Sequence, residues 1–124
     1  MIASELASAI VPTKYGELRI CVLHIGESRA EHVAVVKGSV RDVEDVPAYL
    51  HVECLFGHVF GALPCGCRAR LERALERLAQ TDVGVLVYVR SEPRPASFDD
   101  AFAASVIRAL GARSVVLVPE DAHG

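Results

Sequence analysis

The chain has 124 residues, of which 52% are hydrophobic and 23% are charged, and its formal net charge is −3. This length suggests a single domain, residues 1–124, that can bury a core of its own. The weakly acidic balance argues against nucleic acid and membrane-surface partners, because both require clustered Lys and Arg side chains. The longest apolar run, residues 83–89, is too short to span a bilayer, and residues 1–11 lack the basic start of a secretory signal. We therefore expect a cytoplasmic protein.

The first half of the chain has the pattern of β-strands. Residues 16–25 alternate in polarity, with Leu18 and Ile20 on one face. Residues 31–38 and 46–54 are two further runs rich in β-branched side chains and bounded by turn residues. The pattern predicts that these three strands form an antiparallel meander.

The second half alternates between helix and strand. Residues 66–80 and 97–111 show the 3.6-residue period of amphipathic helices, and Gly111 is placed to stop the second helix in a left-handed conformation. Residues 83–90 and 114–119 read as buried strands. This order favours parallel pairing through crossover helices. The sequence therefore predicts an α+β domain with a mixed sheet, antiparallel at first and parallel later, packed by two main helices.

Three of the four cysteines lie close together, at Cys54, Cys65 and Cys67. The last two flank Gly66, which lets the backbone turn tightly just before the first predicted helix. In a reducing compartment clustered cysteines are more often metal ligands or catalytic thiols than disulfides. Three thiolates suit one zinc ion and leave its fourth tetrahedral position open to water.

Other interpretations of the cysteines remain open. Buried cysteines often serve only for packing, and a disulfide between Cys65 and Cys67 would be sterically awkward. A purely structural zinc site would need a fourth protein ligand, for which Cys21 and His58 are the candidates.

Several polar residues near the cysteines are candidates for chemistry. Glu53 could move a proton, although strict alternation places it opposite Cys54 and a bulge would be needed; otherwise it is a solvent-facing carboxylate. His58 could act in acid–base chemistry or be an ordinary turn histidine.

Four more residues are candidate substrate contacts. Tyr49 and His51 share one face of their strand and could line a pocket, where Tyr49 could stack on a flat heterocycle, or they could form an ordinary half-buried face. Glu92 and Arg94 follow the strand 83–90 at its carboxyl end, where ligands commonly bind beside parallel strands. They could contact substrate or belong to a rigid loop.

Four stretches carry a family resemblance: "VPTKYGELRI", "EHVAVVKGSV", "HVECLFGHVFGALPCGCRARLERALERLAQTDVGVLVYVRSE" and "VIRALGARSVVLV". Together they make the chain similar to the GTP cyclohydrolase II family, as a shortened and divergent member. The resemblance implies one catalytic zinc per chain, held by Cys54, Cys65 and Cys67. It also implies a homodimer and the family's reaction, in which the imidazole ring of GTP is opened, formate and pyrophosphate are released and riboflavin synthesis begins, with Mg²⁺ at the phosphates.

The chain departs from the family pattern in its nucleotide-binding half. The family's Arg, Asp, Asp and Gln are replaced by Tyr49, His58, Gly66 and Arg70. The loop "SEPRP" keeps Glu92 and Arg94 but has prolines in place of glycines. The segment that follows this loop in the family, with its Asp-x-Arg pair, is missing.

These features favour a zinc-dependent hydrolase or cyclase that acts on a C–N bond of a small nitrogen heterocycle or purine-like compound through zinc-activated water. In that reading Arg70 contacts substrate, and Mg²⁺ takes part only if the substrate is a nucleotide. A first alternative is a catalytically silent binding or assembly protein that zinc stabilises. A second is genuine GTP cyclohydrolase II activity.

Overall fold

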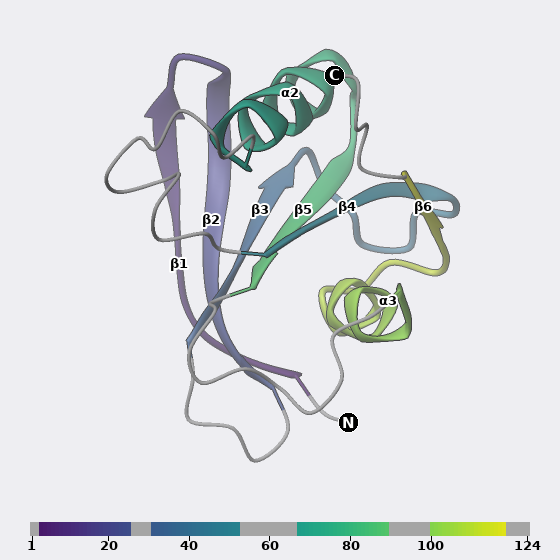
Figure 1. Ribbon diagram of the computed structural model, residues 1–124. Helices are drawn as coiled ribbons and strands as arrows, with labels where there is room; N and C mark the ends of the chain where they lie inside the picture. Colours follow the sequence, from purple (N-terminus) through teal and green to yellow (C-terminus); the bar gives the residue numbers. More distant parts are fainter. Residues whose placement is uncertain (1–2, 26–30, 53–66, 90–99, 119–124) are drawn as a thin grey trace.

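The computed structural model describes residues 3–25, 31–52, 67–89 and 100–118 (Figure 1). These residues form one six-stranded sheet and two helices. The elements, in chain order, are β1 (Ala3–Thr13), β2 (Gly16–Ile25), β3 (His32–Lys37), β4 (Val46–Val52), α2 (Cys67–Gln80), β5 (Gly84–Val89), α3 (Asp100–Ala109) and β6 (Val115–Leu117). The predicted α+β class with a mixed sheet is confirmed.

The strand order in the sheet is β1-β2-β3-β5-β4-β6. Strands β1, β2, β3 and β5 pair in antiparallel fashion, whereas β4 pairs in parallel with both β5 and β6. The predicted meander is therefore correct in kind but wrong in its members. The observed N-terminal meander consists of β1, β2 and β3, whereas the sequence predicted β2, β3 and β4. Strand β5 lies between β3 and β4, because α2 carries the chain back to start β5 parallel to β4.

The hairpin between β1 and β2 closes through a two-residue turn, in which Thr13 is the register partner of Gly16. The Thr13 hydroxyl donates a hydrogen bond to the Gly16 carbonyl (2.8 Å) and accepts one from the Tyr15 amide (3.0 Å). The Lys14 ammonium lies 5.2 Å from the centre of the Tyr15 ring, which is within range of a cation–π contact. A local side-chain network thus fixes the turn and the positions of both residues in it.

The helices cover opposite faces of the sheet (Figure 1). Along β5, Leu86 packs in the core under α2, while its neighbours Val85 and Val87 pack in the core under α3. This is the alternation expected of a strand that is buried on both faces. Each fully buried aliphatic side chain contributes about 1.5–3 kcal/mol of hydrophobic stabilisation.

Carbonyl groups at the carboxyl ends of both helices accept hydrogen bonds from specific groups. Helix α3 is followed by Gly111 in the predicted left-handed conformation (φ 106°), and the Gly111 amide donates to the Arg108 carbonyl at 2.9 Å. At the end of α2, the Lys37 ammonium donates a hydrogen bond to the Ala79 carbonyl, and the Thr81 hydroxyl donates to the Leu78 carbonyl at 2.8 Å. A cation at the carboxyl end of a helix also complements its dipole. Neither helix in the described residues combines the length and the apolar character that crossing a membrane requires.

Candidate active site

The carboxyl ends of β4 and β5 lie side by side, because Val52 and Val89 are register partners in a parallel pair. The segment after β4 carries two of the cysteines and leads into α2, and the segment after β5 carries Glu92 and Arg94. Both segments therefore begin at the same end of the sheet, next to each other. The carboxyl end of parallel strands is the usual position of ligands.

Most of the predicted site residues lie outside the described part of the chain; they are Glu53, Cys54, His58, Cys65, Glu92 and Arg94. Their roles stay predictions. Among the described residues, no group of three or more His, Cys, Asp or Glu side chains is placed to hold a metal ion. The zinc site therefore also stays a prediction.

The backbone at Cys67 fits the expected metal chemistry. Cys67 is the first residue of α2, and the first turn of this helix contains Arg68 and Arg70 but no acidic residue. A helix N-terminus and nearby cations stabilise negative charge, which is what a thiolate ligand needs. The chemistry of the three sulfur donors thus fits zinc, since Cys54, Cys65 and Cys67 would supply three of its four ligands.

Cys21 is poorly placed to complete a structural zinc site. It is fully buried in the aliphatic core under α3, on the face of the sheet opposite α2. Cys21 on β2 pairs with Ala34 on β3, Ala34 pairs with Val87 on β5, and Val87 pairs with Leu50 on β4. Three strand spacings, about 14 Å, therefore separate Cys21 from β4. Cys21 therefore packs in the sheet, which lies between it and helix α2.

Among the described residues, His51 and Tyr88 form one wall of the candidate site. They are register partners on β4 and β5, and their rings stack with centroids 5.9 Å apart and planes inclined by 26°. His51 is only 3% exposed and lies one residue before the end of β4. The sequence pattern identified His51 as a candidate but not Tyr88. The feature that could have indicated Tyr88 is a single aromatic side chain near the carboxyl end of an otherwise aliphatic strand.

Tyr49 lies on the same face as His51, as the alternation predicted, but deeper in the protein. It is 8% exposed and packs with Leu18, Leu78 and Leu86 under α2. Burial raises the pKa of the Tyr49 phenol, and the charge of Arg77 partly opposes this shift. The hydroxyl is therefore neutral at physiological pH. Stacking of a heterocycle on the ring stays a prediction, and the packed ring offers little exposed surface for it.

A pocket of about 280 Å³ opens beside this wall, between the β1–β2 turn and the first turns of α2. It is lined by Lys14, Tyr15, Arg68, Leu71, Glu72, Leu75 and Tyr88. The Arg68 guanidinium lies 3.6 Å from the Glu72 carboxylate, one helical turn away. The predicted contact Arg70 is half-buried in the same first turn of α2. The opening of this pocket combines cationic side chains with aromatic rings, which suits a flat ligand that carries negative charge.

Comparison with known proteins gives a consistent result. The family model described as GTP cyclohydrolase II matches residues 4–115. The riboflavin biosynthesis protein RibBA of Chlamydia muridarum (strain MoPn / Nigg) is 40% identical over 111 residues, which are 89% of this chain and 26% of that protein. The GTP cyclohydrolase-2 of Actinobacillus succinogenes is 38% identical over 90 residues, 73% of this chain and 42% of that one. The chain thus spans between about a quarter and two fifths of these relatives.

A solved structure supports the fold alone. RibBX of A. baumannii, a two-domain 3,4-dihydroxy-2-butanone 4-phosphate synthase, superposes with a TM-score of 0.63. The match covers 98% of this chain and 35% of that one, at 16% sequence identity. The likeness therefore extends over the whole sheet and both helices.

Proposed function

The chain belongs to the GTP cyclohydrolase II family of hydrolases, and from this we propose that it is a zinc-dependent enzyme that breaks a C–N bond in a small, purine-like nitrogen heterocycle. The observation that carries the proposal is the meeting of β4 and β5 at Val52 and Val89. The cysteine-bearing segment begins at this point and ends at the N-terminus of α2.

Cys54, Cys65 and Cys67 would hold the zinc ion, which supplies Lewis acidity and a nucleophilic water when it is bound. The protein's own groups do the rest of the work. Glu53 accepts and returns a proton, and His58 provides a second acid–base group close to neutral pH. The neutral Tyr49, packed in the core under α2, and His51, stacked on Tyr88, would form the floor of this site.

The described pocket supports the choice of substrate class. Tyr15 and Tyr88 present ring surfaces, while Lys14 and the Arg68–Glu72 ion pair line the same opening. Arg70, Glu92 and Arg94 would add polar contacts from the helix and from the loop after β5. The family's Asp-x-Arg pair is missing, and the pocket volume of about 280 Å³ is small. We therefore favour a substrate with fewer phosphates than GTP, and Mg²⁺ takes part only with a nucleotide.

Genuine GTP ring opening is the second candidate, because several relatives carry the name GTP cyclohydrolase-2. In that case a second copy of the chain would supply the missing groups in a homodimer. Strands β1 and β6 each pair on one side only within the described sheet, which leaves edges for such an assembly.

Turnover assays separate these candidates. Zinc-loaded protein is incubated with GTP and Mg²⁺, and separately with unphosphorylated purines and related heterocycles, and formate and ring loss are measured. The proposal predicts zinc-dependent turnover of a heterocycle, lost in Cys65→Ala and kept in the matched variant Cys21→Ala, which removes a cysteine from the other face of the sheet. Formate from GTP alone would favour the second candidate. A folded, zinc-loaded protein that turns over none of these compounds would instead be a silent binding protein.

A further inference from the structure

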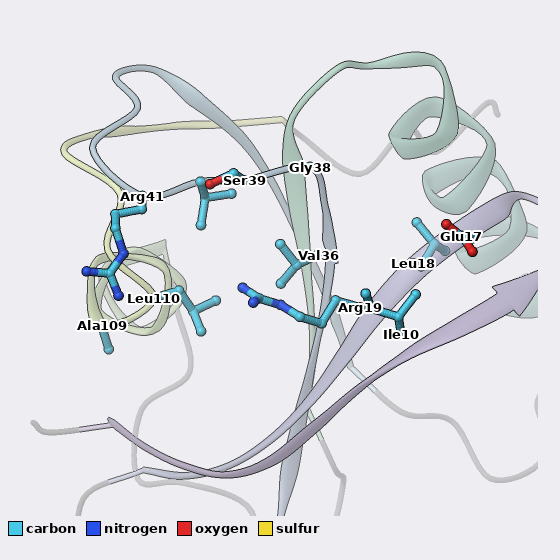
Figure 2. A pocket seen from close by; sticks show the side chains of 11 residues that line it. Ile10, Glu17, Leu18, Arg19, Val36, Gly38, Ser39, Arg41, Ala109 and Leu110 are labelled. Atoms are coloured by element: carbon cyan, nitrogen blue, oxygen red, sulfur yellow. The ribbon is translucent and has the colours of Figure 1, made fainter.

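A second pocket lies on the opposite face and at the opposite end of the sheet (Figure 2). It has a volume of about 450 Å³ and is bounded by the start of β2, the turn after β3 and the end of α3. Its polar lining comes chiefly from Arg19, Arg41, Ser39 and Glu17. Val36, which lines this pocket, pairs with Val85 on β5, and Val85 lies four positions before Val89 at the candidate active site. That distance is about 13 Å at 3.3 Å per residue, so the two sites are separate.

Two arginines line this pocket from different elements, Arg19 from β2 and Arg41 from the turn after β3. Figure 2 shows the Arg19 side chain extending toward Leu110, away from Glu17, and the Arg41 side chain directed toward the end of α3. In the part of the chain that the structure describes, no hydrogen bond or ion pair occupies either guanidinium. Two unpaired guanidinium groups around one cavity offer planar donors that match phosphate or carboxylate oxygens.

Both arginines are held by rigid backbone. Arg19 lies in the middle of the hairpin, paired with Ile10 on one side and with Val36 on the other. Arg41 precedes Asp42, a non-glycine residue in the left-handed region (φ 63°). Such a conformation persists only where its surroundings fix it.

Contacts with the turn after α3 fix the Arg41 loop. The Asp42 amide donates to the Gly111 carbonyl (2.9 Å), and the Arg113 amide donates to the Val43 carbonyl (2.8 Å). A Cβ added to Gly111 would lie 3.4 Å from the Arg41 Cα, so the two backbones are in close contact. The backbone of Arg41 is therefore held in place before any ligand arrives, which lowers part of the entropic cost of binding.

Apolar side chains form another part of the pocket wall. Ile10 is 68% exposed, which is unusual for a large aliphatic side chain, and it lines the pocket with Val36 and Leu110. A ligand that covers Ile10 removes apolar surface from water while its anionic group meets the arginines. We propose that this pocket binds a small amphipathic anion, with a phosphate or carboxylate between Arg19 and Arg41 and an apolar ring against Ile10.

NMR titration of the full chain at low ionic strength tests the proposal, with inorganic phosphate, phenyl phosphate, benzoate and phenol as probes. We expect saturable shifts at the amides of Gly38, Ser39 and Leu110. Phenyl phosphate or benzoate should bind at least about fivefold more tightly than inorganic phosphate, because only they cover the apolar wall. A preference for phenyl phosphate assigns a phosphate ester, and a preference for benzoate assigns a carboxylate.

Matched variants test the arginines. Arg41→Gln and Arg19→Gln should each weaken binding on the order of tenfold, as expected when a charged hydrogen bond is lost. Arg113→Gln removes the same charge from an exposed site outside the pocket and should change the affinity less than about twofold. Shifts that do not saturate, phenol binding as tightly as the anions, or equal weakening in all three variants would overturn the proposal. Both pocket arginines are exposed, so the variants should fold, and circular dichroism checks that they do.

Discussion

The two faces of the sheet are built from different side chains. The core under α3 is largely aliphatic, with Val36, Val85, Val87 and Ile107 fully or almost fully buried, although the buried His32 shares a face of β3 with Val36. The core under α2 also holds Tyr49, and His51 and Tyr88 stack at its edge. Aliphatic packing contributes stability without directional chemistry, whereas buried rings with polar atoms place donors and acceptors at fixed points. The difference indicates that the buried core under α3 mainly stabilises the fold and that the α2 face positions the candidate active site.

The largest effect should follow truncation of the aliphatic face. Ile107→Ala removes a fully buried side chain of α3 and should lower the free energy of unfolding by about 2–5 kcal/mol. Urea denaturation measures the change. Val116→Ala, at a side chain that is 49% exposed, is the control and should cost less than about 0.5 kcal/mol. Comparable losses in the two variants would contradict the assignment of this core.

A smaller effect on stability, but a clear one on activity, should follow replacement of His51. His51→Phe keeps a ring against Tyr88 and should change the free energy of unfolding by less than about 1.5 kcal/mol. Because it removes both ring nitrogens beside the candidate site, kcat/KM should fall by about tenfold or more. Tyr88→Phe retains the stacking and is the matched control. If His51→Phe unfolds the protein while leaving the activity per folded molecule intact, His51 is a core residue and the contrast between the faces is wrong.

The smallest effect is a pH dependence confined to alkaline solution. Burial raises the pKa of Tyr49 above its ordinary value of 10.0, so the folded state holds this proton more tightly than the unfolded state does. Stability from this group is therefore complete below pH 10 and is lost as the pH rises through the folded pKa. Denaturation at pH 8 to 11 should show a shallower alkaline decline for Tyr49→Phe than for the wild type. Identical slopes would show that the phenol is not desolvated.

The sequence predicted elements better than their arrangement. The strong alternation of residues 16–25 located β2 with its observed bounds, and the amphipathic period of residues 66–80 located α2 to within one residue at its start. Strand β1 was missed because the alternation in "ASELASAIVPT" is weak and its residues 7–12 are exposed. The meander was misassigned because periodicity reports which residues are buried and not which strands are neighbours.

The same distinction applies to the candidate site. The two-residue spacing of Tyr49 and His51 was enough to place them on one face, and the family resemblance pointed to Cys54, Cys65 and Cys67. The partner of His51, by contrast, follows from the parallel register that pairs it with Tyr88. The pocket joins the β1–β2 turn to α2. Both depend on contacts between distant parts of the chain, which no local pattern reveals.

The central claim is that three cysteines hold one zinc ion at the carboxyl ends of β4 and β5. Elemental analysis of protein purified without chelators tests it most directly, comparing the wild type with Cys54→Ala, Cys65→Ala, Cys67→Ala and the control Cys21→Ala. We expect about one zinc per chain in the wild type and the control, and a loss of most of the metal in each of the other three. A folded wild type without zinc, or full zinc content in the three variants, would contradict the account.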